Sequence, residues 1–146
     1  MTKITRQKIF EKIQRLDKYL SYLKQLRKEI KSEKAFLDDF HFHGLADRYL
    51  QLSCQTVIDI LNLLIIEKDL PMPESGQEIV SFLLNKKIIS EELYSRLFGV
   101  VGFRNILVHE YGIIDHKKVY KYMMEKLEDF EIFKKEILTI IRNSTS

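Results

Sequence analysis

The regular spacing of apolar residues near the start of the chain constrains its fold more than any other feature. From Ile9 to Ile30 these residues recur at steps of four, three, four, three, three and four. This period predicts an amphipathic α-helix over residues 4–30, about seven turns long, with Lys and Glu on its opposite face. A stripe this regular packs either within the chain or against a second subunit, and the spacing fits both arrangements.

The rest of the chain also has helical periodicity, and no segment shows the alternation of a β-strand. Residues 32–47 mix a helical turn with a looser segment that ends near Gly44. A helix expected over residues 46–68 is apolar on most sides, which predicts that it is the buried central helix. The prolines within residues 71–76 end this helix. Further helices are expected over residues 77–85, 91–111 and 116–141.

The composition supports an all-α fold. Only five Gly and two Pro occur among 146 residues, while Leu, Lys, Glu and Ile are abundant. Ser90 and Asp115 are the expected N-caps of the last two helices, and Gly112 lies where a helix commonly ends. The length suits one core and is too short for two ordinary domains. We therefore expect a single domain over residues 1–146, built as an up-and-down bundle of four to five helices.

Charge, cysteine content and hydropathy limit the class of protein further. The net charge of +3 permits contact with nucleic acid but does not argue for it. Cys54, the one cysteine, excludes an internal disulfide framework and fits a reducing compartment. The N-terminal residues lack the apolar core of a signal peptide, and the longest apolar run is too short for a bilayer and contains Asp59. The sequence predicts a cytoplasmic protein without a membrane segment.

The segment FRNILVHEYG, residues 103–112, carries four polar groups within eight positions of an apolar helix. At about 100° per residue, the polar groups fall on two stripes. One stripe contains Phe98, Gly102, Asn105 and His109, and the other contains Leu93, Leu97, Val100, Arg104, Leu107 and Tyr111. Arg104 and His109 lie about 140° apart, so they do not share a face of an ideal helix. A long arginine side chain, a distorted helix end or a second copy of the helix would each bring them together.

These residue types suit cleavage of RNA by its own 2′-hydroxyl. His109 is the natural proton carrier near neutral pH, and the planar fork of Arg104 matches phosphate oxygens. Asn105 offers a donor and an acceptor beside them, and Gly102 leaves a gap through which a substrate or another backbone can approach. No divalent metal is needed for this chemistry. The structural alternative is a helix cap with a surface cation, in which Tyr111 is a half-buried core residue.

Three other sets of polar residues are candidates for a site. His41 and His43 suggest a metal, but they are expected to be two solvated histidines in a loop, so no metal or cofactor is predicted. Asp59 lies in an apolar helix and needs a partner, for which Arg104 and Arg48 are candidates. It is either a structural ion pair or a support for the site. Cys54 is expected to be a core residue rather than a nucleophile.

GFRNILVHEY matches the R-x-x-x-x-H-x-Y pattern of HEPN-domain toxins of the HepT family, the partners of small nucleotidyltransferase (MNT) antitoxins. The resemblance covers nearly the whole chain. RYLQLSCQTVIDILNLLI resembles the central helix of that family, LPMPESGQEIVSFLLNKKIISEEL resembles its connecting region, and GIIDHKKVYKYMMEKLEDF resembles the segment after the motif. The match is complete at all three motif positions.

This resemblance implies a helical homodimer with its site in a cleft lined by both copies of the motif helix. It implies that Arg104 and His109 carry endoribonuclease activity on RNA, either tRNA or mRNA, with Asn105 assisting. It also implies an MNT nucleotidyltransferase antitoxin that transfers AMP from ATP onto Tyr111. The alternative is a non-catalytic helical dimer that binds a nucleotidyltransferase partner or a nucleotide.

Overall fold

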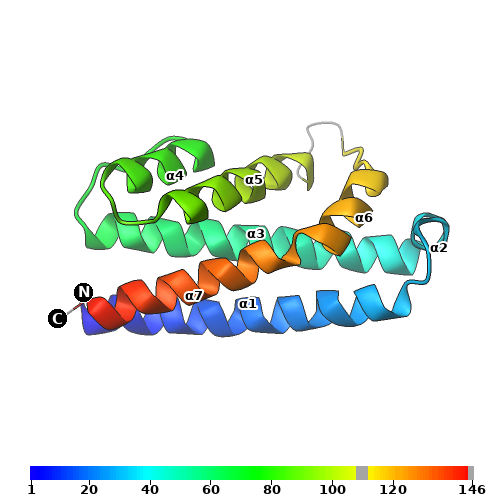
Figure 1. The fold of residues 1–146 in the computed structure, drawn as a ribbon, viewed down its shortest axis with the longest axis horizontal. Helices are drawn as coiled ribbons and strands as arrows, with labels where there is room; N and C mark the ends of the chain where they lie inside the picture. Colours follow the sequence, from blue (N-terminus) through cyan, green and yellow to red (C-terminus); the bar gives the residue numbers. More distant parts are fainter. Residues whose placement is uncertain (108–111, 145–146) are drawn as a thin grey trace.

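The computed structural model describes residues 1–107 and 112–144. In this part of the chain the secondary structure consists of seven α-helices, with no strand (Figure 1). The helices are α1 (Lys3–Glu29), α2 (Glu33–Asp38), α3 (Phe40–Glu67), α4 (Gly76–Asn85), α5 (Glu91–Leu107), α6 (His116–Glu125) and α7 (Leu127–Asn143). The predicted all-α class is confirmed, whereas the predicted number of four to five helices is wrong.

One additional helix comes from the segment between α1 and α3. Ser32 caps α2, because its hydroxyl accepts a hydrogen bond from the backbone N–H of Ala35 at 3.0 Å. Asp39 caps α3 in the same way, accepting from the N–H of His41 at 2.9 Å. Gly44, expected to mark the end of a loose segment, lies inside α3. Two N-caps close together therefore start α2 and α3 within residues 32–47, where a helical turn and a looser segment were predicted.

The other additional helix comes from a break in the predicted helix over residues 116–141. Lys126 interrupts it with φ −119° and ψ 5°, and its N–H donates to the carbonyl of Tyr122 at 2.8 Å. Val119, Met123 and Leu127 are all buried, so the apolar spacing continues through the break and does not mark it. The break turns α6 out of the line of α7 and towards the beginning of α3 (Figure 1).

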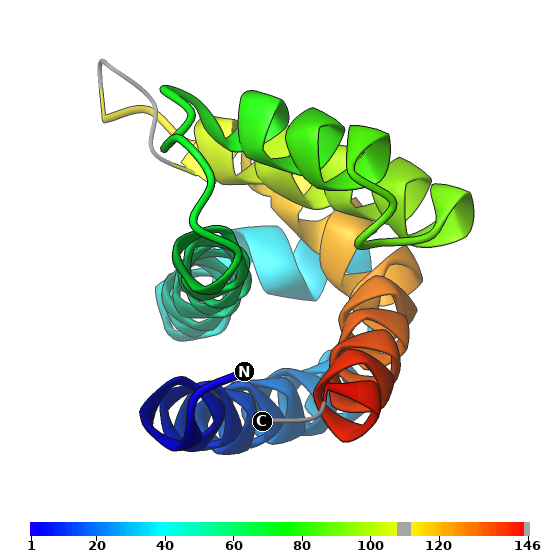
Figure 2. The same cartoon turned by 90° about the vertical axis from the view of Figure 1, so that its left-hand side faces the viewer.

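Helix α3 is the centre of the bundle. It contacts each of the other six helices, most extensively α1, which runs alongside it (Figures 1 and 2). Nine of its apolar side chains are buried in the core, among them Leu50, Val57, Leu61 and Leu64, which have no exposed surface. The predicted buried central helix is confirmed, although it starts at Phe40 rather than near Ala46.

The apolarity of α3 has a second consequence. Within the described residues, α3 is the helix that is long and apolar enough to cross a bilayer, judged by length and composition alone. The central helix of a bundle meets the same criteria, because it is covered by other helices on most sides. Packing within the bundle thus explains its composition.

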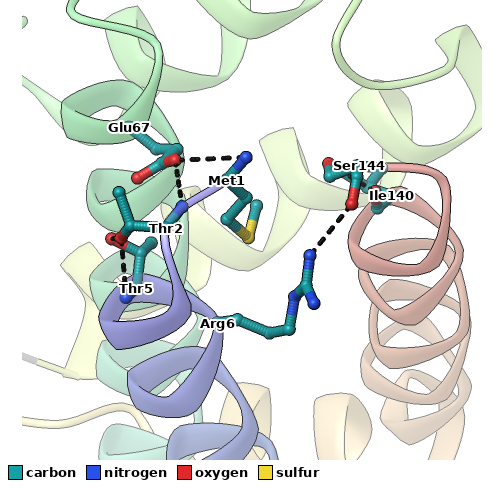
Figure 3. Close-up of polar contacts among 7 residues, drawn as sticks. All are labelled: Met1, Thr2, Thr5, Arg6, Glu67, Ile140 and Ser144. Atoms are coloured by element: carbon teal, nitrogen blue, oxygen red, sulfur yellow. Dashed lines mark hydrogen bonds and ion pairs between the residues drawn. The ribbon is translucent and has the colours of Figure 1, made fainter. Parts of the chain in front are cut away.

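The beginning of α1 is tied to the ends of α3 and α7 (Figure 3). The backbone N–H of Thr2 donates to Glu67 Oε1 at 2.6 Å. Arg6 Nη2 donates to the backbone carbonyl of Ser144 at 2.9 Å. Thr2 also caps α1, since its hydroxyl accepts from the N–H of Thr5 at 3.1 Å. These contacts fix one end of the bundle, opposite the end where α2 and α6 lie (Figure 1).

An ion-pair network between α1 and α7 gives a pH prediction. Glu131 pairs with Lys24 at 2.8 Å and with Lys134 at 2.8 Å, and Lys134 also pairs with Asp17. Partial burial acts to raise the pKa of Glu131, but hydrogen bonds from Lys134 and Lys24 outweigh it and lower that pKa below its ordinary value. A lowered folded-state pKa stabilises the fold above the ordinary pKa, and this contribution disappears as the pH falls through the lowered value.

We expect Glu131→Gln to lower the free energy of unfolding by up to about 1 kcal/mol at pH 7, because the network is partly exposed. The difference from the parent is expected to shrink as the pH falls below the ordinary glutamate pKa of about 4.3 and to disappear once the pH is below the lowered value. Urea unfolding at pH 7 and at pH 3.5 measures both effects. Glu125→Gln, at an exposed position of α6, is the matched control and is expected to change neither. A Glu131→Gln effect that is equal at both pH values would contradict the electrostatic origin.

Candidate active site at the end of α5

The start of α5 is fixed as the sequence predicts. The Ser90 hydroxyl accepts a hydrogen bond from the N–H of Leu93 at 3.1 Å, and Glu91 and Glu92 occupy the first turn. The same hydroxyl donates to Glu136 Oε1 at 2.6 Å, which ties the cap to α7. The helix is therefore held at its beginning, and its C-terminal turn carries the polar motif.

The two stripes predicted for this helix are present in its described part. Leu93, Leu97, Val100 and Leu107 are buried on the core side. On the other side, Phe98 is 44% exposed, Asn105 is exposed, and a Cβ added to Gly102 would meet no atom within 4 Å beyond its own helix. We call Phe98, Gly102 and Asn105 the open face of α5. It offers a ligand or a second helix an unobstructed approach beside Arg104.

Arg104 is half-buried on the core-side stripe of α5, and a contact with α3 orients its side chain. Its Nη2 donates a hydrogen bond to Gln55 Oε1 at 3.0 Å. The amide of Gln55 in turn donates through Nε2 to Asp59 Oδ1 at 2.9 Å. Because the carboxylate takes the amide NH₂ group, the amide oxygen is turned towards the guanidinium. Lys12 Nζ lies 3.7 Å from Asp59 Oδ2 and completes the chain. The guanidinium is thus oriented rather than loose.

The structure changes the interpretation of Asp59. Its side chain is 38% exposed, so the carboxylate is not buried as the sequence suggested. Its ion pair is with Lys12, not with either of the two arginines considered, and it reaches Arg104 only through Gln55. Asp59 therefore lies two hydrogen bonds away from the guanidinium that it was expected to meet directly.

Gln55 is the residue of this site that the sequence did not reveal. Its spacing of four from Asp59 places both on one face of α3, and this i,i+4 pairing is visible in the sequence. Its contact with Arg104 is not visible there, because it depends on how α3 and α5 pack. Arg104 keeps further N–H donors on its guanidinium beyond the one that Gln55 takes, and two parallel donors are what a phosphate binds.

Cys54 is a core residue, as predicted. Its side chain has no exposed surface, and burial raises the pKa of the thiol to about 12, an effect that the nearby Arg104 only partly offsets. A thiol with this pKa is protonated at neutral pH and is not a nucleophile.

His109 and Tyr111 lie outside the described residues, so the angle between Arg104 and His109 stays a prediction. Past that segment, Gly112 has a φ of +69°, a conformation that favours glycine. Asp115 then caps α6, accepting hydrogen bonds from the N–H groups of Lys117 at 3.1 Å and Lys118 at 3.3 Å. The predicted cap is confirmed, and it fixes where the chain re-enters the bundle after the motif.

The structure corrects the interpretation of the two histidines near the start of α3. His41 and His43 lie in the first turns of that helix rather than in a loop. His41 is exposed, but His43 is half-buried, and its ring lies 4.1 Å from that of His116. Along α3, His43 lies twelve residues before Gln55, the residue that binds Arg104, so this pair of histidines is separate from the Arg104 site.

Comparisons with known proteins show the family to which the chain is similar. The family model described as "Ribonuclease HepT-like" matches residues 11–137. The mRNA nuclease HepT of Shewanella oneidensis is 30% identical over 111 residues, which cover 76% of this chain and 84% of the relative. The tRNA nuclease HepT of Aphanizomenon flos-aquae is 28% identical over 142 residues, which cover 94% of this chain and 92% of the relative.

The fold is also similar to that of a solved toxin. The tri-AMPylated HEPN toxin of Shewanella oneidensis, in complex with its MNT antitoxin, superposes with a TM-score of 0.78 at 28% identity. The superposition covers 95% of this chain and 99% of the toxin. The family match spans most of the chain, including Gln55 and Arg104. This chain therefore belongs to the HepT-like family, the HEPN toxins of MNT–HEPN toxin–antitoxin systems.

Proposed function

We propose that this protein is the toxin of such a system and acts as a cytoplasmic, metal-independent endoribonuclease. The observation that carries the proposal is the oriented guanidinium of Arg104, held by Gln55 at the edge of the open face of α5. A pre-oriented cation beside an accessible surface is suited to binding a phosphodiester. The two curated relatives, an mRNA nuclease and a tRNA nuclease, support RNA as the substrate class.

The proposed reaction is attack of a ribose 2′-hydroxyl on the adjacent phosphate. His109 takes the hydroxyl proton as the O2′–P bond forms, and Arg104 stabilises the charge that builds on the phosphoryl oxygens. The P–O5′ bond breaks, and the departing oxygen takes up a proton from an imidazolium. The products are a 2′,3′-cyclic phosphate and a 5′-hydroxyl end. Asn105, exposed on the next residue, is assigned to hydrogen bonding with the substrate.

A homodimer would supply the second imidazole or guanidinium that this chemistry uses. The open face of α5 has no bulk at Gly102, so another α5 can approach closely there. A two-fold axis next to this face places two copies of Arg104 and His109 in one cleft. This arrangement also removes the difficulty of the 140° separation within one helix.

Neutralisation is proposed to occur by AMP transfer from an MNT nucleotidyltransferase onto Tyr111. AMP on this phenol would add bulk and negative charge close to Arg104, which excludes an RNA phosphate. The AMPylated state of the solved Shewanella toxin, which is bound to its MNT antitoxin, supports this step. Intact-mass measurement after co-expression with the antitoxin is expected to show AMP increments that are absent in Tyr111→Phe. A Tyr111→Phe chain that gains the same mass would contradict the assignment.

The nuclease proposal is tested by incubating the purified dimer-sized fraction with tRNA and with mRNA, in chelator and in magnesium. We expect cleavage in both buffers, with cyclic phosphate ends, and loss of cleavage in His109→Ala. Cleavage only with magnesium would contradict the metal-independent mechanism. A folded protein that binds its antitoxin but cleaves no RNA would favour the alternative, a non-catalytic dimer that binds a nucleotidyltransferase or a nucleotide.

Gly102→Ala is expected to separate stability from activity. Alanine removes the conformational cost of glycine inside α5, so the free energy of unfolding is expected to rise by about 0.5–1 kcal/mol. The added methyl enters the gap of the open face of α5, so cleavage is expected to fall by about tenfold or more. Gly44→Ala is the matched control, since Gly44 lies in α3 with nothing within 4 Å of an added Cβ. It is expected to stabilise without changing cleavage. If Gly102→Ala and Gly44→Ala cleave RNA at the same rate, Gly102 is not part of the active site.

A further inference from the structure

A cluster of two imidazoles and a carboxylate lies where the beginnings of α3 and α6 meet. His43 and Asp47 are on α3, and His116 is the first residue of α6. One nitrogen from each histidine and one oxygen of Asp47 all lie within 4.8 Å of one another. His116 Nδ1 is 3.4 Å from Asp47 Oδ2, and the two imidazole centroids are 4.1 Å apart. No other such group occurs among residues 1–107 and 112–144.

The fold places these side chains there by independent local features. His43 and Asp47 are four residues apart, so they share one face of α3. Asp115 caps α6 and thereby fixes the position of His116 in the first turn. The buried ring of Phe36, from α2, contacts the edge of His43 at 6.3 Å between centroids. Three helices therefore hold the cluster in position.

The cluster is not satisfied by its own hydrogen bonds. Within the described part of the chain, Asp47 Oδ1 and His116 Nδ1 are both buried and have no hydrogen-bond partner. The side chain of Asp47 is only 17% exposed. Unpaired polar atoms of this kind cost free energy unless a ligand meets them.

A simple ion pair does not account for this arrangement. A single proton between His116 and Asp47 would leave Asp47 Oδ1 unpaired and would not explain why His43 approaches as well. A dication that binds both imidazoles and the carboxylate satisfies all three groups at once.

We propose that His43, Asp47 and His116 bind one divalent transition-metal ion of the zinc class. Two nitrogens and one oxygen suit Zn²⁺ rather than Mg²⁺ or Ca²⁺, which take oxygen ligands. Tetrahedral zinc with bonds of about 2.0–2.1 Å needs ligand atoms about 3.4 Å apart, so small side-chain rotations close the present separations. The fourth position is left to a water molecule.

The ion would hold the first turn of α6 against α3. In the sequence, this turn comes just after the family motif. Gln55 follows His43 by twelve residues, which is about 18 Å along α3, so the metal lies apart from the guanidinium of Arg104. The proposed ion therefore lies outside the nuclease site, and the proposal does not depend on the nuclease assignment. Metal-independent cleavage and a zinc ion at this separate position are compatible.

The test uses the full chain without a histidine tag, treated with chelator and dialysed. The metal-free chain is then loaded with zinc. Its zinc content after gel filtration gives the stoichiometry, and competition with a chromophoric chelator gives the affinity. Co²⁺ in place of zinc gives a visible spectrum. We expect one ion per chain, tetrahedral Co²⁺ bands without a thiolate charge-transfer band, and a zinc-dependent rise in Tm. The missing thiolate band distinguishes this site from binding at Cys54.

His43→Ala, Asp47→Asn and His116→Ala are each expected to weaken zinc binding at least tenfold. His41→Ala is the matched control, because His41 lies two residues away on α3 and is exposed. It is expected to bind zinc as the parent does. Asp47→Asn keeps the shape of the side chain, and the Co²⁺ spectrum needs no variant, so a misfolded alanine variant does not obscure the result. The proposal is overturned if the parent binds no ion, or if His41→Ala weakens binding as much as His116→Ala.

Discussion

Arg104→Ala is expected to lower the rate of RNA cleavage by about 100- to 1,000-fold, the usual cost of removing one group that stabilises charge on the reacting phosphate. Among the described residues, the variant loses one side-chain hydrogen bond, to Gln55 at 3.0 Å, so its free energy of unfolding is expected to fall by about 1 kcal/mol. Initial rates in chelator, measured beside thermal unfolding, give the two quantities separately.

Arg96→Ala is the matched control for this prediction. Arg96 lies on the same helix and donates to Asp129 Oδ1 at 2.7 Å, a carboxylate that is 8% exposed. Removing Arg96 leaves Asp129 buried without that partner, so the Tm is expected to fall while the folded protein still cleaves RNA. The two variants are thus expected to have opposite effects. Arg104→Ala loses activity and keeps most of its stability, whereas Arg96→Ala loses stability and keeps its activity. Parental cleavage by Arg104→Ala would contradict the catalytic assignment.

Gln55→Leu tests whether the orientation of the guanidinium matters. Leucine fills a similar volume but cannot accept the hydrogen bond from Arg104, so the side chain is free to rotate. We expect cleavage to fall by about tenfold, mainly in kcat, with little change in Tm. The residue is a positioning residue, and Gln55→Glu, which restores an acceptor, is expected to recover part of the rate. An unchanged rate in Gln55→Leu would show that Arg104 is oriented by other contacts.

The sequence predicted most of the fold because helical periodicity is local. The spacing from Ile9 to Ile30 and the caps Ser90 and Asp115 depend only on neighbouring residues, and the structure has them as expected. The break at Lys126 was missed because apolar residues continue through it. The early start of α3 was missed because it is set by the cap at Asp39, which the spacing of apolar residues does not show.

The sites were less predictable because they depend on contacts between helices. The i,i+4 pairs Gln55–Asp59 and His43–Asp47 are present in the sequence, and each is half of a cluster. The other half comes from a distant helix, which is α5 for Arg104 and α6 for His116. Local spacing alone does not show which helix packs against α3 at each position.

Phe103→Ala is expected to destabilise the protein by about 3–5 kcal/mol, the largest stability effect predicted for this chain. Phe103 is 5% exposed and stacks on Tyr122 of α6, with centroids 3.8 Å apart and planes inclined by 4°. Tyr122 in turn meets Phe130 of α7 edge-on at 6.3 Å, so the ring of Phe103 anchors the last turn of α5 to two helices. At about 2–4 °C per kcal/mol, the Tm is expected to fall by roughly 10 °C.

The effect of Phe103→Ala on cleavage follows from its position directly before Arg104. Loss of the anchor frees the turn that carries the guanidinium, so cleavage is expected to fall even below the Tm, where the protein is still folded. Tyr122→Phe is the matched control. Its hydroxyl is buried without a hydrogen-bond partner among the described residues, and burial raises the pKa of the phenol, so removing the oxygen is expected to leave the Tm unchanged or raise it. A Tm that falls as far in Tyr122→Phe as in Phe103→Ala would mean that the hydroxyl, rather than the stacked rings, holds the end of α5 in place.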